Sequence, residues 1–216
     1  MHSEFHAQCY SILAHVSHFS SSGRFAHMNA SRRQAAGGLC SIFGTYTTIT
    51  DYCFLSANLE LLVYNTTEKT AGNILCRYDS DHQIECNSTF FKRYDGKSPR
   101  VAALFKGSFI NWNENSDIPD ALEIYKKDDA KEEYTFHSFE TYEYAEKNHA
   151  CAVVSVLKFG DMTPEGTVMD RELRLNGSAL QNPTAYKDCW DKFNYILQNL
   201  RLTANSHYSD GCKPQL

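Results

Sequence analysis

Short apolar runs alternate with turn residues between Leu59 and Leu175, and this pattern constrains the fold more than any other feature of the sequence. Successive side chains of a strand point to opposite faces, so such runs predict antiparallel strands joined by hairpins. Turn residues separate the runs, for example at Asp95-Gly96 and at Pro164-Glu165-Gly166. The predicted strands are Leu59–Thr67, Ile74–Asp81, Ser88–Tyr94, Val101–Ile110, Leu122–Lys126, Glu133–Glu140, Thr141–Ala145, Cys151–Lys158 and Arg171–Leu175. Eight or nine strands at this spacing indicate an all-β sandwich or barrel.

The hydrophobic period changes towards the carboxyl terminus. After Asn182-Pro183-Thr184, which is a typical helix start, the residues Trp190, Phe193, Leu197 and Leu200 recur at helical spacing. The pattern predicts one amphipathic helix packed on the outside of the sheet. We interpret its aromatic stripe as core packing.

The charge of the chain argues against two classes of partner. Lys and Arg number 21 against 26 Asp and Glu, which gives a formal net charge of -5. Duplex DNA and anionic membranes call for clustered positive charge, so neither a nucleic acid nor a membrane surface is expected as a partner. The sequence also has no uninterrupted apolar stretch of about 18 residues, the length that a membrane-spanning helix requires.

Eight cysteines point to an oxidising compartment. They do not form the Cys-x-x-Cys pairs with nearby histidine that structural zinc sites use, so disulfides are the better interpretation and no metal is expected. The sequence also has Asn-x-Ser/Thr glycosylation acceptors at Asn29, Asn65, Asn87 and Asn176. Together these features predict a secreted, extracellular glycoprotein.

The first fifty residues differ from the rest of the chain. They are rich in His and Ser, and the nearest approach to a signal-peptide core is the short run Ala35–Phe43. We therefore expect residues 1–50 to be a poorly ordered or non-native extension. The globular domain is predicted to span residues 51–216.

Several segments resemble the tick salivary lipocalins of the histamine-binding family, over roughly Asp51 to Cys212. The order of strand-cysteine, strand-cysteine, helix-cysteine and terminal cysteine is the specific part of the resemblance. The segments are DYCFLSANLELLVYNTT (Asp51–Thr67), AGNILCRY (Ala71–Tyr78), HACAVVSVL (His149–Leu157), RELRL (Arg171–Leu175), PTAYKDCWDKF (Pro183–Phe193) and HYSDGC (His207–Cys212).

The resemblance implies an eight-stranded antiparallel lipocalin barrel with a carboxy-terminal helix on its outside. It also implies the disulfides Cys76–Cys212 and Cys151–Cys189. The second bond would staple the helix to the barrel, because Cys189 opens the helix and Cys151 opens a strand. Four cysteines remain, namely Cys9, Cys40, Cys53 and Cys86; a Cys53–Cys86 bond is possible, and a free or intermolecular thiol is the alternative.

Members of this family that bind amines cage the protonated amine with acidic and aromatic groups. Their signature has an Asp after the strand cysteine and a Glu-Leu-Trp run on a later strand, whereas this chain has Ala152 and then Glu172-Leu173-Arg174. Residues two apart share a face, so Arg174 is expected to pair with Glu172 inside the barrel and to cancel the charge meant for an amine. Histamine and serotonin are therefore expected to bind weakly.

The remaining interior candidates are aromatic, which favours a hydrophobic ligand. Our first hypothesis is a secreted lipocalin that sequesters a small host mediator, such as a fatty acid, eicosanoid or sterol, during blood feeding. Biogenic-amine binding is the alternative, and a third possibility is an immunomodulator that binds a host protein and uses the barrel as a scaffold. The predicted ligand-binding residues are Phe105, Phe109, Trp112, Phe136, Glu140, Tyr142, Tyr144, Glu172 and Arg174, and strand alternation places Phe136, Glu140, Tyr142 and Tyr144 on one face if no bulge intervenes.

Enzymatic activity is the weakest hypothesis. His137 and His149 have carboxylates nearby in the sequence, at Glu140 and Glu146, which is a possible acid-base arrangement. However, the sequence contains no Gly-x-Ser-x-Gly, no His-Glu-x-x-His and no glycine-rich phosphate loop. We therefore expect a binding protein without a cofactor.

Overall fold

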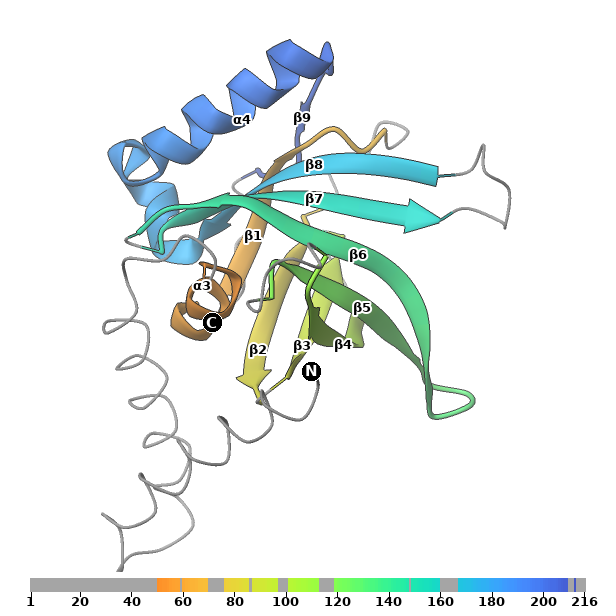
Figure 1. Cartoon of the computed structure of the whole chain (residues 1–216). Coiled ribbons are helices and arrows are strands. Elements are labelled where there is room, and N and C mark those ends of the chain that lie inside the picture. The colour runs from red at the N-terminus through yellow and green to blue at the C-terminus, as the bar shows by residue number, and fades with distance from the viewer. Residues whose placement is uncertain are drawn as a thin grey trace, which may run out of the picture.

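Eight antiparallel strands close into a barrel in the computed structural model of the chain (Figure 1). The structure describes residues 50–58, 60–69, 76–85, 87–96, 101–112, 119–147, 149–159, 167–209 and 212. Each strand pairs with the next along the chain except that β1 pairs with both β2 and β8, which closes the barrel. A short ninth strand pairs with the last two residues of β1. The strands are β1 (Glu60–Thr66), β2 (Tyr78–Ile84), β3 (Ser88–Asp95), β4 (Val101–Ile110), β5 (Ala121–Asp128), β6 (Glu133–Ala145), β7 (Cys151–Phe159), β8 (Thr167–Asn176) and β9 (Asn205–Ser206).

The structure confirms the predicted barrel and corrects two of its strands. The segments Glu133–Glu140 and Thr141–Ala145 are one continuous strand, β6, because no turn residue separates them. The second strand begins at Tyr78 and extends to Ile84, beyond the predicted Ile74–Asp81. The second half of this strand, Asp81 to Gln83, is polar, so a prediction based on apolar residues could not detect it.

The two faces of β7 and β8 serve different cores. Ala152, Val154 and Val156 point into the barrel and are buried there. The alternating residues Cys151 and Val153 point outward, into a second apolar cluster beneath the carboxy-terminal helix. Since both faces are covered, the sequence of β7 is a nearly continuous apolar run.

That helix, α4 (Lys187–Leu200), lies across the outer face of the barrel as predicted (Figure 1). It follows two 3-10 turns, η3 (Gly177–Gln181) and η4 (Pro183–Tyr186), so the α-helix itself begins later than Asn182-Pro183 indicated. Its buried residues are Cys189, Phe193 and Ile196, whereas Leu200 is exposed. Among the helices that the structure describes, none combines the length and the apolar character that crossing a membrane requires.

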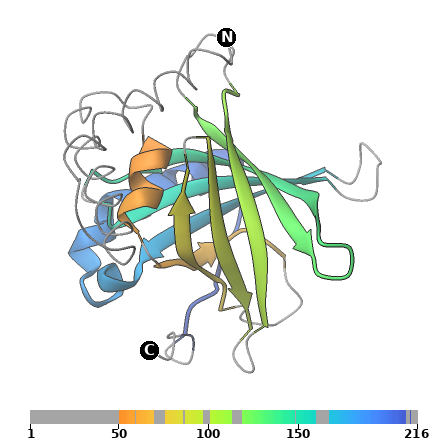
Figure 2. The ribbon, with the colours of Figure 1, turned by 90° about the horizontal axis from the view of Figure 1, so that it is seen from below.

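A short helix, α3 (Thr50–Ala57), closes one end of the barrel (Figure 2). It contacts β2 and β6, and its Phe54 and Leu55 are buried in the interior cluster. The Phe54 ring lies 5.8 Å from the ring of Tyr142. The opposite end, where β1 and β7 finish and β2 begins, is called the mouth below.

Both disulfides implied by the family resemblance are present. Cys151–Cys189 joins the first residue of β7 to α4, with the two Cα atoms 6.1 Å apart. Cys76–Cys212 joins the residues before β2 to the end of the described chain, with the Cα atoms 5.0 Å apart. Cys9, Cys40 and Cys86 lie outside the described residues, as does the side chain of Cys53, so the Cys53–Cys86 hypothesis stays a prediction.

Candidate ligand-binding site

The centre of the barrel is a network of buried ion pairs. Arg93 on β3 contacts both carboxylate oxygens of its cross-strand partner Asp79, at 2.7 Å each, and also Oε1 of Glu140 at 2.9 Å. Glu140 in turn accepts a 2.6 Å bond from Arg174, whose Nε donates to Glu172 at 2.8 Å. The pairing of Arg174 with Glu172 is therefore confirmed. All five side chains are 5% exposed or less, so the barrel centre is more highly charged than the aromatic interior expected around Glu172 and Arg174.

The network continues to the mouth, where solvent reaches it. Arg77 lies 3.1 Å from Glu172, 2.9 Å from Glu68 and 2.9 Å from Asp95. Lys158 donates to the second oxygen of Glu68 at 2.9 Å. Side-chain exposure rises from 11% for Arg77 to 52% for Asp95, which marks this end as the accessible one.

Aromatic side chains fill the space beside the network. Phe91 and Phe105 stack with their centroids 5.6 Å apart, and the guanidinium of Arg93 lies 5.3 and 5.1 Å from the two rings. A Cβ added at the neighbouring Gly107 would lie 3.0–3.1 Å from side chains on β3 and β5. Both rings are almost fully buried and belong to the packed interior of the barrel.

The arginines keep the buried carboxylates charged. Burial alone would raise the pKa of Glu140, but Arg174 and Arg93 outweigh it and hold that pKa far below the usual range. Burial likewise opposes ionisation of Glu172, and Arg174 with Arg77 lowers its pKa. At Glu68, Arg77 and Lys158 overcome burial and lower the pKa to about 2. The interior is therefore ionised at neutral pH.

One interior carboxylate differs from the others. Asp170 on β8 pairs with the inward-facing Val156 and accepts a hydrogen bond from Thr67 at 3.2 Å. Among the described residues, no Lys or Arg side chain forms an ion pair with it. Burial raises its pKa, the charge of Lys158 opposes that increase, and the nearby Glu68 adds to it. Asp170 is therefore a buried carboxylate that no described Lys or Arg side chain contacts directly.

The two histidines on the strands of the interior are neutral. Burial lowers the pKa of His82 and of His137 to about 4 in each case. The His82 ring stacks on Phe91 at 4.9 Å, and that of His137 meets the edge of Phe105 at 5.2 Å. Within the described ranges, no cluster of three or more His, Cys, Asp or Glu side chains is arranged to hold a metal ion.

The predicted ligand-binding residues divide among four locations. Glu140, Glu172 and Arg174 are in the buried network, and Phe105, Phe109 and Tyr142 belong to the interior apolar cluster. Tyr144 lies in the outer cluster beneath α4, where its hydroxyl donates to Glu146 at 2.8 Å. Trp112 and Phe136 are on the outer surface, 53% and 39% exposed. No ligand contact tests these assignments.

Two irregularities in β6 cause the split. The pairing register shifts between Ile124 and Tyr125 on the β5 side, and again between Tyr142 and Tyr144 on the β7 side. Each extra residue reverses the alternation, so Phe136 and Tyr144 leave the face that holds Glu140 and Tyr142. Phe136 instead joins an outer aromatic patch whose described members are Trp112, Tyr125, Phe136, Phe139 and Phe159.

Sequence reasoning missed Asp79, Arg93, Arg77 and Glu68, which complete the network. A signal was present, because Arg77 and Asp79, like Arg93 and Asp95, are two residues apart and so share a face of their strands. Opposite charges at the same spacing on adjacent strands are typical of paired side chains. The pairing register of the two strands, which decides which charges lie opposite each other, could not be derived from the sequence.

The three described glycosylation acceptors differ in accessibility. Asn87 is exposed, and Asn65 is half-buried on β1. The Asn176 amide caps η3, accepting from the Ser178 backbone N–H at 2.9 Å, and its Nδ2 donates to the buried Asn58. A glycan needs that same Nδ2 atom, so Asn176 is poorly placed to carry one.

We expect glycan occupancy to follow this difference in protein secreted from eukaryotic cells. Asn87→Gln should lower the mass by one glycan, as measured by intact mass spectrometry. Asn176→Gln should leave the mass of attached sugar unchanged and destabilise the fold by about 1 kcal/mol through the lost cap. A full glycan on Asn176 in folded protein would contradict the expectation.

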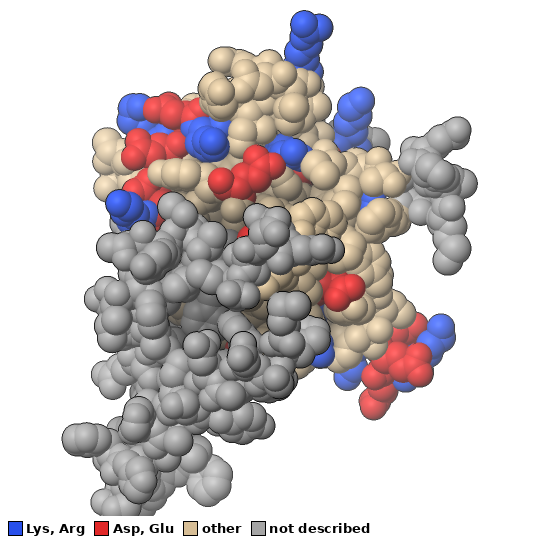
Figure 3. Space-filling view, in the orientation of Figure 1, with Lys and Arg blue, Asp and Glu red and all other residues tan. Residues whose placement is uncertain are grey.

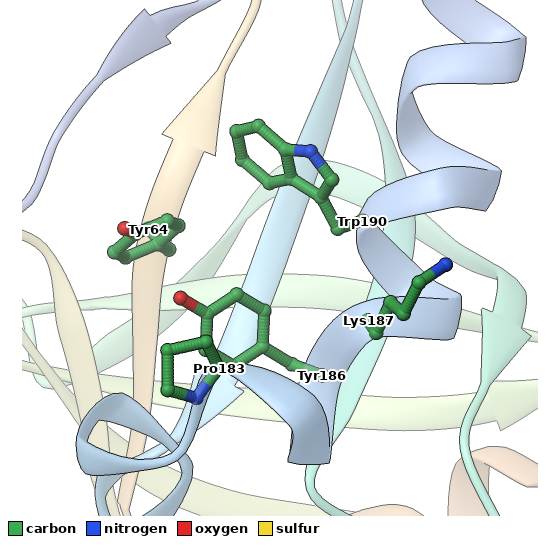
Figure 4. Close-up of a pocket in the computed structure, with 5 residues that line it drawn as sticks. All are labelled: Tyr64, Pro183, Tyr186, Lys187 and Trp190. Atoms are coloured by element: carbon green, nitrogen blue, oxygen red, sulfur yellow. The ribbon is translucent and has the colours of Figure 1, made fainter.

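A separate pocket lies outside the barrel, between β1 and the start of α4 (Figure 4). Tyr64, Pro183, Tyr186, Lys187 and Trp190 line it, and its volume is about 220 Å³. The ring centroids of Tyr64 and Trp190 are 6.3 Å apart, and those of Tyr64 and Tyr186 are 5.7 Å apart. None of these residues contributes to the charged interior.

Comparison with known proteins yields similarity of structure only. No protein-family model matches the sequence, and no curated protein matches it. The solved structure of a deswapped triple mutant of bovine odorant-binding protein is similar, with 8% identity, a TM-score of 0.48, and coverage of 76% of this chain and 99% of that one. Lobster apocrustacyanin A1 has 8% identity and a TM-score of 0.40, covering 82% and 86% of the two chains. Apocrustacyanin C1 has 9% identity and a TM-score of 0.40, covering 82% and 87%.

The strand order itself defines the fold class. An up-and-down barrel of eight antiparallel strands, closed by β1 against β8, with a helix packed on its outside, is the lipocalin architecture. Its interior differs from the mainly aromatic one expected from the sequence, because several charged side chains occupy its centre.

Proposed function

We propose that this chain is a secreted lipocalin that sequesters a small ligand through a protonated amine held at the mouth of the barrel. The observation that carries the proposal is the charge imbalance of the interior and the mouth taken together. Six carboxylates, those of Glu68, Asp79, Asp95, Glu140, Asp170 and Glu172, face the four cationic side chains of Arg77, Arg93, Lys158 and Arg174. A cationic ligand would reduce this imbalance, whereas a fatty acid would increase it.

This proposal reverses the order of ligands that the sequence favoured. The sequence argument weighed Arg174 against Glu172 alone and concluded that no charge remained for an amine. In the structure, Arg174 is shared between Glu172 and Glu140, and Asp170 forms no direct ion pair with a described Lys or Arg side chain. The two disulfides favour secretion. The resemblance to tick salivary lipocalins favours a host mediator as the ligand.

Asp170 provides the test. Asp170→Asn keeps a side chain that can bond to Thr67 but removes the charge, so we expect histamine and serotonin to bind at least about tenfold more weakly, as measured by calorimetry. The matched control is Asp129→Asn, which removes a carboxylate from the exposed turn after β5. Because the pKa of Asp170 is raised, amine affinity should be full above that pKa and should fall as the pH drops through it.

Three results would contradict the amine assignment. These are tighter binding of a fatty acid than of either amine, equal affinities for the Asp170→Asn and Asp129→Asn variants, and amine binding that is independent of pH between 4 and 7. The first of these would restore the hydrophobic mediator as the best candidate.

A protein partner is the second candidate, and the outer aromatic patch favours it. Trp112 and Phe159 are each 53% exposed, next to Phe136 and Phe139 on the surface of the sheet. Figure 3 shows a largely uncharged surface over β6 to β8, between the charges near α4 and those on the hairpin that joins β5 to β6. Aromatic residues of this kind are enriched at protein interfaces. Native mass spectrometry of secreted protein separates the candidates, since a retained small molecule supports sequestration and an empty barrel supports the scaffold.

A further inference from the structure

We propose that the outer pocket between β1 and α4 is a second binding site, which takes a quaternary ammonium group. The site is independent of the amine site proposed at the mouth, because it shares no residue with the charged interior. Three aromatic residues from three different elements surround it: Tyr64 on β1, Tyr186 on η4 and Trp190 on α4 (Figure 4). A volume of about 220 Å³ is sufficient for a trimethylammonium head group.

The inclination of the rings supports a cation as the occupant. The Tyr64 and Trp190 rings are 69° apart in orientation, and those of Tyr64 and Tyr186 are 53° apart. Rings stacked in parallel would leave no space that all three could border, whereas these inclined rings line one pocket. A cation within about 6 Å of each centroid gains from all three ring faces. Tyr208 also contacts Tyr64, with the two ring centroids 5.9 Å apart, and is not part of the pocket lining.

The charged residues at the rim are compatible with a cationic ligand. Lys187 lines the pocket, but its ammonium group bonds to Asp191 and extends away from the three rings (Figure 4). Asp188 in the first turn of α4 offsets the partial positive charge of that helix end. A quaternary ammonium group has no N–H to donate, so it needs ring faces and methyl contacts instead of buried acceptors. The pocket provides that lining.

Choline is the probe for the test, and the intrinsic fluorescence of Trp190 is the readout. The chain has two tryptophans, so Trp112→Phe leaves Trp190 as the single emitter. We expect choline to change its emission saturably. The neutral carbon analogue of choline, in which a quaternary carbon replaces the nitrogen, should bind at least tenfold more weakly.

Matched variants assign the effect to the pocket. In the same background, Tyr186→Leu keeps an apolar side chain but removes one ring face, and choline should bind at least tenfold more weakly. Tyr195→Leu is the control, because Tyr195 is exposed on α4 and its ring contacts Lys192. Asp170→Asn should leave the choline response unchanged, which separates this site from the mouth. If Tyr186→Leu does not fold, the comparison of choline with its neutral analogue on the otherwise unaltered protein still decides.

The proposal is overturned if choline gives no saturable response, if the neutral analogue binds equally well, or if Tyr186→Leu and Tyr195→Leu behave alike. A free cation and a lipid head group present the same chemistry, and phosphatidylcholine vesicles distinguish them. Sedimentation of the protein with these vesicles, reversed by free choline, would assign the site to a head group. Choline binding without sedimentation would assign it to a soluble ligand.

Discussion

Replacing Arg174 with methionine is expected to lower the free energy of unfolding by about 4 kcal/mol. Arg174 lies between Glu140 and Glu172, both of which are almost completely buried. Without the guanidinium, Glu172 keeps only Arg77 and Glu140 keeps only Arg93, so negative charge in the barrel centre loses half of its compensation. Methionine reproduces the aliphatic part of the arginine side chain, so the change removes mainly the guanidinium group. Urea denaturation of the pure protein measures the difference.

Lys187→Met is the control for Arg174→Met. Lys187 forms an ion pair with Asp191 on the surface of α4, and both side chains are more than half exposed. Exposed surface pairs of this kind contribute little, so the free energy of unfolding should be almost unchanged. A change at Arg174 as small as that at Lys187 would mean that the buried network is not formed as described.

Removing the Cys76–Cys212 bond by Cys76→Ala with Cys212→Ala should cost about 5 kcal/mol, because the bond closes a loop of 136 residues in the unfolded chain. The equivalent change at Cys151 and Cys189, which are 38 residues apart, should cost about 4 kcal/mol. Both estimates follow the chain-entropy account of disulfides. Thermal and denaturant unfolding, with free thiols counted by chemical labelling, give the comparison.

The two disulfide variants also serve as controls for each other. The Cys151–Cys189 variant should loosen α4, because that bond fixes the helix to β7 above the apolar cluster of Phe193 and Leu173. The Cys76–Cys212 variant should leave α4 in place. Unchanged stability in either variant would contradict the corresponding bond.

Sequence patterns predicted most of the strands because strand alternation is a local property, whereas the choice of a closed barrel over a sandwich came from the family resemblance. The inward residues of β7 and β8 could be assigned from period alone, and so could the pairing of Arg174 with Glu172. The outward position of Phe136 could not be predicted, because it depends on an extra residue in β6. No residue type in the sequence indicates that irregularity. The bridging role of Glu140 depends in addition on contacts across the barrel, with Arg93 and Arg174.

The pocket beneath α4 shows a different limit. Trp190 was correctly placed on an amphipathic helix and interpreted as core packing, and it does pack against the outer apolar cluster. The same ring also faces solvent beside Tyr64 and Tyr186, which are separated from each other by more than a hundred residues of sequence. A site assembled from a strand and a distant helix leaves no periodic trace.

Glu140 joins opposite walls of the barrel, because Arg93 belongs to β3 and Arg174 to β8. This bridge acts as an ionic strut across the lumen. Widening the barrel would separate charges in a region from which water is excluded, so radial breathing there is energetically opposed. A ligand should consequently enter the barrel only as far as this ionic bridge. The amides of the strands on both sides of the bridge should be protected from hydrogen exchange to a similar degree.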